Sequence, residues 1–174
     1  MSAAGITATI LVFALNAYVL LGGADFGGGV WDLLARGPRA EGQRGLVAHA
    51  IGPVWEANHV WLILAIVLLF TCFPAAFARV SILLHIPLAL MLVGIVVRGS
   101  AFTFRSSGAG EAAFERRWGR AFAGASLLTP VLLGMTLAAV ASGRLAMPAA
   151  GEGVAFADVY VAPWLTAFGL AGGG

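Results

Sequence analysis

Two acidic residues, a histidine and an arginine are the side chains of this sequence best suited to chemistry. Asp25, Glu56 and Arg98 border long stretches without charge, and His59 lies just inside one of them. Glu56 and His59 are three residues apart, so they share one face of a helix. Because ionisable groups at membrane depth are costly, such residues are typical of proton relays. The pattern therefore predicts a proton relay that uses Asp25, Glu56 and His59.

A purely structural role for the same side chains is the alternative. Asp25 and Glu56 can lie in the headgroup region and pair with Arg98, orienting the helices without moving protons. In either case the expected topology brings these residues to one membrane boundary, the cytoplasmic one.

Metal and haem sites are not expected within this chain. The Glu56-x-x-His59 spacing is that of di-iron helical bundles, but these need a second such motif and further glutamates, which the other apolar stretches lack. His59 and His85 are expected at depths that differ by about 15–20 Å, too far apart to share one haem iron. A lone histidine paired with Met91 stays an open alternative. Cys72 has no partner in the chain for a disulfide.

Membrane-spanning helices are the elements expected to position these residues. Hydrophobic residues make up 60% of the sequence and charged residues 10%, far from the globular balance. Each of four stretches lacks Asp, Glu, Lys and Arg and approaches the roughly 20 residues that cross a bilayer. They are residues 6–24, 57–78, 80–97 and 121–143. The sequence predicts an all-α integral membrane bundle, a single domain over residues 1–174 with four transmembrane helices and the start of a fifth.

Glycines and prolines suggest where these helices end. The first is expected over residues 6–21, leaving the membrane at a glycine-rich stretch and followed by a loop over residues 33–49. The second is expected to end near Pro74, and Pro87 to loosen the third helix in its middle. The fourth helix is expected over residues 121–140.

Most arginines fall in the loops expected after the first and third helices. They are Arg36, Arg39 and Arg44 in one loop and Arg105, Arg116, Arg117 and Arg120 in the other. By the positive-inside rule both loops are cytoplasmic and the N-terminus is outside. The arginines thus sort by membrane side, which argues against a nucleic-acid partner.

Three motifs occur near the expected helix boundaries. Residues 24–29 read ADFGGG, residues 52–62 read GPVWEANHVWL, and residues 98–105 read RGSAFTFR. In this order they resemble segments of subunit II of the cytochrome bd-type quinol oxidases. Members of that family are longer, so the resemblance is to their N-terminal half.

The resemblance implies a subunit of a terminal quinol:oxygen oxidoreductase in the bacterial inner (plasma) membrane. Haems b and d and the quinol site would belong to a partner, subunit I, in a heterodimer, while this chain binds no cofactor alone and contacts lipid. The chain would be a scaffold and part of a cytoplasmic proton path in which Asp25 and Glu56 match family acids. Gly22 and Ala57 depart from the family pattern, since an acid usually stands at the first position and a glycine at the second. The resemblance assigns positioning or interface roles to Trp55, Asn58, Trp61, Arg98 and Arg105.

A small membrane transporter or channel bundle is the alternative function. Transporters bind substrates near the membrane midplane, often at charged groups. The expected helix centres here carry no charge, so the pattern favours an oxidase subunit.

Overall fold

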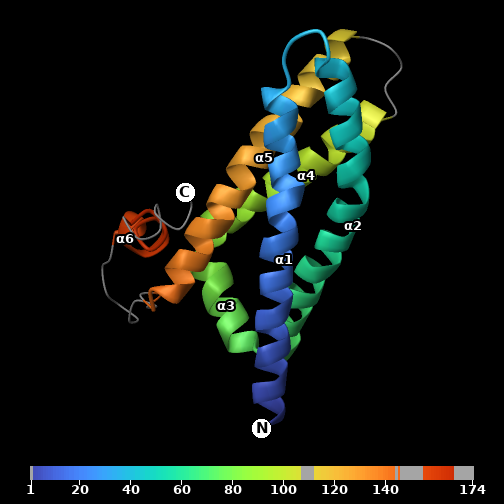
Figure 1. The fold of residues 1–174 in the computed structure, drawn as a ribbon. Coiled ribbons are helices and arrows are strands. Elements are labelled where there is room, and N and C mark those ends of the chain that lie inside the picture. Colours follow the sequence, from blue (N-terminus) through green and yellow to red (C-terminus); the bar gives the residue numbers. More distant parts are fainter. Residues whose placement is uncertain (1, 107–111, 144, 146–154, 167–174) are drawn as a thin grey trace. The chain divides into compact units, whose positions relative to one another are not determined.

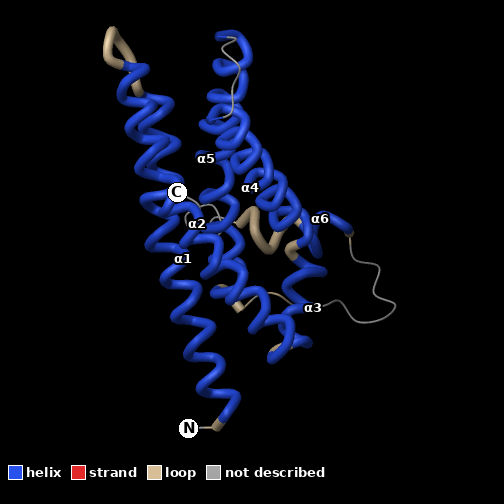
Figure 2. Tube along the Cα trace, turned by 90° about the vertical axis from the view of Figure 1, so that its right-hand side faces the viewer, coloured by secondary structure: helices blue, strands red, loops and turns tan. Residues whose placement is uncertain are grey.

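The computed structural model describes residues 2–106, 112–143, 145 and 155–166, which form helices joined by loops and turns, with no strand among them (Figures 1 and 2). Four of the described helices are long and apolar enough to cross a membrane, as predicted. The helices, in chain order, are α1 (Ala3–Leu34), α2 (Ala40–Cys72), α3 (Pro74–Leu83), α4 (His85–Ser106), α5 (Ala112–Ala141) and α6 (Phe156–Tyr160).

The chain divides into two compact units. Unit 1 comprises Met1–Pro74 and Val97–Leu127, and unit 2 comprises Ala75–Val96 and Leu128–Gly174. Helices α4 and α5 therefore contribute residues to both units. The single-domain organisation stays a prediction.

In unit 1, α1 and α2 form an antiparallel hairpin joined by a short loop (Figure 1). Gly37 in this loop has a φ of 83°, a conformation that favours glycine. Arg44 closes the hairpin, because its Nε donates to the carbonyl oxygen of Asp32 and its Nη2 to that of Ala35. These bonds satisfy carbonyls at the end of α1, where the helix itself offers no partner.

Close helix contacts in unit 1 depend on two glycines of α1. A Cβ added at Gly28 would overlap the side chain of Ile51 on α2. A Cβ at Gly29 would overlap both Oγ and Cβ of Ser126 on α5. Small residues at such positions allow helix backbones in a membrane to approach closely.

In unit 2, Pro87 explains the break between α3 and α4. Proline has no N–H to donate to the carbonyl of Leu83, and its ring clashes with that carbonyl, so α3 ends at Leu83. Leu84 at the break is fully buried and packs with Met135, Ala139 and Trp164 in the core of this unit. The loosening predicted at Pro87 is thus a one-residue break at Leu84, and helical hydrogen bonds continue on both sides, from Leu84 N to Val80 O and from Leu88 N to Leu84 O.

Several predicted boundaries are wrong. Helix α1 does not end near residue 21 but continues through the glycines to Leu34, and α2 already begins at Ala40, so the loop expected over residues 33–49 is mostly helical. Helix α4 continues through Arg98 to Ser106. A helix in lipid must satisfy its backbone groups internally, which favours continuous helices even through glycine-rich sequence. Asp25 and Arg98 consequently lie inside helices.

The remaining boundaries differ less. Helix α2 ends at Cys72 and Pro74 opens α3, as expected for the proline. Helix α5 covers the predicted fourth helix and begins earlier, at Ala112. Within the predicted fifth run, α6 ends at Tyr160 and turns follow to residue 166, while residues 167–174 lie outside the described part of the chain.

Candidate functional site

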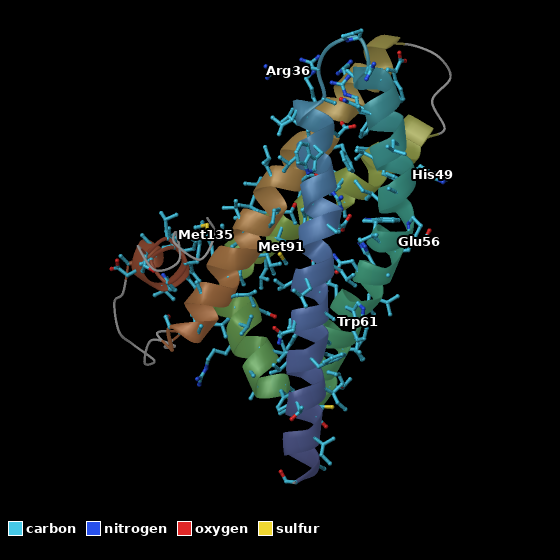
Figure 3. The ribbon with its side chains drawn as sticks, viewed as in Figure 1. Arg36, His49, Glu56, Trp61, Met91 and Met135 are labelled. Carbon is cyan, nitrogen blue, oxygen red and sulfur yellow. The ribbon has the colours of Figure 1, made fainter. Side chains whose placement is uncertain are left out.

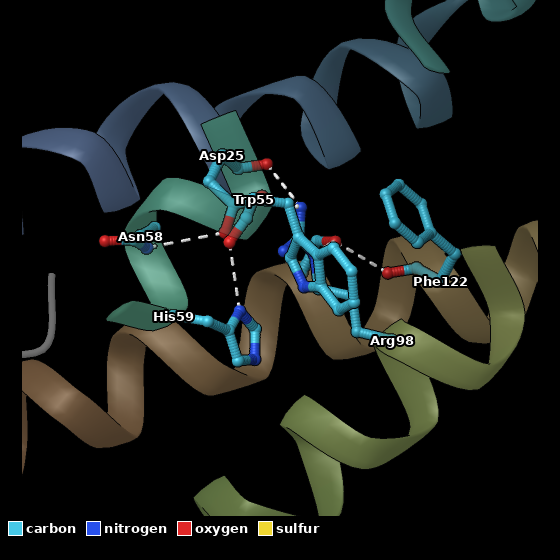
Figure 4. A network of polar contacts seen from close by, with 7 residues as sticks. Asp25, Trp55, Asn58, His59, Arg98 and Phe122 are labelled. Atoms are coloured by element: carbon cyan, nitrogen blue, oxygen red, sulfur yellow. Dashed lines mark hydrogen bonds and ion pairs between the residues drawn. The ribbon is translucent and has the colours of Figure 1, made fainter. Parts of the chain in front are cut away.

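A buried ion pair joins α1 and α4 inside unit 1 (Figure 4). Arg98 Nη2 lies 2.6 Å from Asp25 Oδ1, and the two side chains are 3% and 1% exposed. The same nitrogen donates a hydrogen bond to the backbone carbonyl of Asp25. Charges this deeply buried require close pairing, because the loss of water is otherwise uncompensated. The pair therefore fixes α1 against α4.

The guanidinium of Arg98 is enclosed by groups from α1 and α5. Its Nε donates to Ser126 Oγ at 2.9 Å, and Ser126 Oγ donates in turn to the carbonyl oxygen of Phe122 at 2.7 Å. The rings of Phe26 and Phe122 lie 4.8 and 4.9 Å from its central carbon. Aromatic faces stabilise a desolvated cation. Arg98 is thus held by an acid, a hydroxyl and two rings.

Asn58 of α2 completes this buried cluster. Its Nδ2 lies 3.4 Å from Asp25 Oδ2, and its side chain is almost fully buried. Asn58 Oδ1 accepts no hydrogen bond from the described residues. The amide thereby orients the carboxylate from the side opposite Arg98, and the three helices α1, α2 and α4 meet at Asp25.

Trp55 and His59 form the neighbouring part of α2. His59 Nδ1 lies 3.0 Å from the carbonyl oxygen of Trp55, and because a carbonyl oxygen can only accept, Nδ1 is the donor of this bond. The Trp55 and His59 rings lie 4.7 Å apart, and Trp55 also stacks on Phe102 at 5.9 Å. His59 is half-buried and bonds its own helix (Figure 4).

Glu56 lies apart from the Asp25 cluster. It is exposed and projects outward from α2 (Figure 3). Asn58, two positions along, faces inward instead, as helical geometry requires. Of the two acids predicted for the relay, Asp25 is thus buried in an ion pair, whereas Glu56 is exposed.

Two further predicted residues lie elsewhere. Trp61 packs edge to face on Phe13 of α1 at 5.6 Å and so belongs to the α1–α2 contact. Arg105 is on α4, but its side chain lies outside the described part of the chain.

Three residues of the cluster were not identified as site residues from the sequence: Phe26, Phe122 and Ser126. Phe26 directly follows Asp25 in the glycine-rich motif, so its position could have indicated a place in the site. Phe122 and Ser126 lie four residues apart, one helical turn, in a stretch without charges. Only the packing of α5 against α4 reveals their role.

The two histidines of α2 are too far apart to ligate one haem iron. His49 and His59 are ten residues apart on α2, about 15 Å along the helix axis, whereas one iron needs ligands on opposite sides of one porphyrin. His85 lies in unit 2, where its Nδ1 bonds the carbonyl oxygen of Ile82 at 2.9 Å. Among the described residues no group of three or more His, Cys, Asp and Glu side chains could hold a metal ion.

Fold and site together define a class: a multi-pass helical membrane protein whose spans are joined by a buried ion pair. Comparison with protein families narrows this class. Residues 3–174 match the family described as cytochrome bd terminal oxidase subunit II. The chain belongs to this family.

Curated relatives share this family description. The chain is similar to cytochrome bd ubiquinol oxidase subunit 2 of Bacillus subtilis (strain 168), with 30% identity over 118 residues, covering 68% of this chain and 34% of the relative. It is also similar to cytochrome bd-I ubiquinol oxidase subunit 2 of Escherichia coli (strain K12), with 26% identity over 105 residues, covering 60% and 27% of the two chains. The matched part thus spans about a third or less of the length of these relatives.

Proposed function

We propose that the chain acts as subunit II of a cytochrome bd-type terminal quinol:oxygen oxidoreductase. Family membership and the four apolar helices support this function, and the curated relatives carry names of ubiquinol oxidase subunits. Haems b and d and the quinol site are assigned to a haem-bearing subunit I, with which this chain forms a heterodimer. The chain itself ligates no haem and is not catalytic alone.

The proposed orientation places the α1–α2 loop in the cytoplasm and the N-terminus outside, in a bacterial inner membrane. Arg36 and Arg39 in this loop and Arg44 beside it carry the positive charge that favours the cytoplasmic side. The same side then holds the start of α5 with Arg117 and Arg120.

The exposed carboxylate of Glu56 is the observation that carries the proposed proton path. Glu56 lies 16 residues before the end of α2, about 24 Å along the helix, which places it within reach of the hydrocarbon core. Ionisable groups at this depth face a partner or a water-filled cavity rather than lipid. Glu56 therefore faces subunit I, and His59, one turn away, continues the relay through Nε2, since its Nδ1 bonds the Trp55 carbonyl oxygen.

The buried cluster of Asp25, Asn58 and Arg98 provides the part of the proposed proton path that lies inside this subunit. Asp25 is part of the relay as its inner acid, and Asn58 and Arg98 fix the position of its carboxylate. The pairing of Asp25 with Arg98 equally suits a scaffold role, so variants of Asp25 and Glu56 must be tested separately.

The transporter alternative is weaker. The buried charges Asp25 and Arg98 are already paired with each other, so neither is left to coordinate a substrate. Family membership favours the oxidase subunit as well.

Substitution E56Q is expected to lower quinol oxidase turnover of the assembled complex by on the order of a hundredfold, the usual contribution of a positioned proton-transfer group. Glutamine keeps the shape of the side chain but cannot carry a proton, so haem content and assembly should be unchanged. E41Q is the matched control, because Glu41 is exposed in the first turn of the same helix. The assay measures oxygen consumption with quinol, normalised to haem.

Full turnover of E56Q at normal haem content would refute the relay role of Glu56. D25N tests Asp25 in the same assay. A relay acid loses turnover per haem, whereas a scaffold acid loses only the amount of assembled complex.

A further inference from the structure

A cavity of about 370 Å³ lies in unit 1 near the α1–α2 loop. Its walls are mostly apolar and come from α2, α4 and α5: Val47, Ala48, Ile51, Phe102 and Phe122. The volume lies within the range of about 300–1,000 Å³ that is typical of ligand sites. Neither residue of the buried ion pair lines this cavity, but Phe122, whose ring faces the Arg98 guanidinium, borders both the cavity and the Asp25 cluster.

Polar groups are confined to two positions of the lining. Asp32, at the end of α1, is 4% exposed, and His49 on α2 is exposed. A carboxylate has several lone pairs and can accept hydrogen bonds from hydroxyl groups beside those it already accepts. This end of the cavity therefore suits a ligand portion that carries hydroxyls, whereas the rest suits hydrocarbon.

Three arginines lie in the part of the chain that follows Asp32 and leads into the cavity lining on α2. Arg44 precedes the lining residue Gly45 and donates to the carbonyl oxygens of Asp32 and Ala35. Arg36 and Arg39 are exposed in the connecting loop (Figure 3 labels Arg36). In residues 32–45 these three arginines outnumber the two acids, Asp32 and Glu41, so the segment next to the apolar cavity carries a net positive charge. Basic pockets between membrane helices are typical sites for anionic lipid headgroups.

We infer that this cavity binds one anionic phospholipid with a hydroxyl-bearing headgroup, of the phosphatidylglycerol class. The phosphate lies among the arginines of the loop, the headgroup hydroxyls donate to Asp32, and an acyl chain fills the apolar part between α2, α4 and α5. A soluble anion would leave the apolar walls without a partner, and a zwitterionic lipid would lack the net charge. The site is independent of the proposed oxidase function.

A cavity-filling substitution tests the site directly. A48F places a ring in the cavity, whereas A50F places the same ring at an exposed position two residues along α2 that does not line it. Full-length protein is purified in its native assembly and titrated with phosphatidylglycerol or phosphatidylcholine of identical acyl chains, and bound lipids are counted by native mass spectrometry. We expect wild type and A50F to retain one tightly bound phosphatidylglycerol, and A48F to lose it.

Charge variants provide the second test, because A48F can disturb packing. R36Q and R39Q alter exposed side chains, and each should weaken phosphatidylglycerol binding about fivefold, the effect of one arginine near a lipid headgroup. R79Q is the matched control, since Arg79 is exposed on α3 in unit 2.

Three results would overturn the inference. They are equal retention by A48F and A50F, equal affinity for the two lipids, and release of a quinone instead of a phospholipid from A48F in the extracted lipid fraction. Because lipid binding is read without turnover, a failed proton-path test leaves this result unaffected.

Discussion

Substitution R98Q is expected to lower the free energy of unfolding by about 3–5 kcal/mol, the usual cost of removing one partner of a buried ion pair. The Asp25 carboxyl group would remain inside the protein with only the Asn58 amide, at 3.4 Å, as its side-chain partner. The bond to Ser126 and the contacts with the Phe26 and Phe122 rings would be lost at the same time. Unfolding by denaturing detergent, followed by circular dichroism, measures the effect.

The double variant D25N/R98Q shows whether the cost arises from the unpaired charge. Without either charge the interior holds only amides, so we expect the double variant to be more stable than R98Q alone. A double-mutant cycle with D25N gives the coupling between the two side chains. R79Q, an exposed arginine of unit 2, serves as the control and should stay within about 0.5 kcal/mol of wild type. A loss for R98Q no larger than that of R79Q would contradict the buried pair.

The helical membrane fold could be predicted because long stretches without charge leave few alternatives. The helix boundaries were predicted less accurately than the fold, because the glycines after residue 21 were interpreted as the end of the first helix. In residues 22–29 glycine instead provides close contact, as Gly28 and Gly29 show. Intrinsic propensity measured in water is a poor guide where lipid requires every backbone group to be bonded within the segment.

The candidate site was predicted only in part. Asp25, Asn58 and Arg98 were singled out, and the structure brings these three together. Glu56 was expected beside them because all lie near span ends, but its direction on the helix depends on how α2 packs, which periodicity does not reveal when the helix is apolar on all sides. The proton-relay role of Glu56 stays a proposal.

Substitution G29A should destabilise the protein by about 1–3 kcal/mol, the range for overpacking a well-filled interior. The new methyl group would overlap Oγ and Cβ of Ser126, and Cβ cannot rotate away because it is fixed to the backbone of α5. Relief requires α1 and α5 to separate, which also pulls Ser126 Oγ from Arg98 Nε, now at 2.9 Å. The expected loss is therefore larger than that of a single buried contact.

G27A is the matched control two residues earlier on the same helix. A Cβ at Gly27 would meet no atom within 4 Å, so alanine should be neutral there or stabilise the helix by up to about 1 kcal/mol. The double variant G29A/S126G removes the obstructing Cβ and should recover part of the loss, but not the hydrogen bond to Arg98. Equal stability of G29A and G27A would mean that α1 and α5 do not approach at Gly29, and the hydroxyl contact that positions Arg98 would then lack its structural basis.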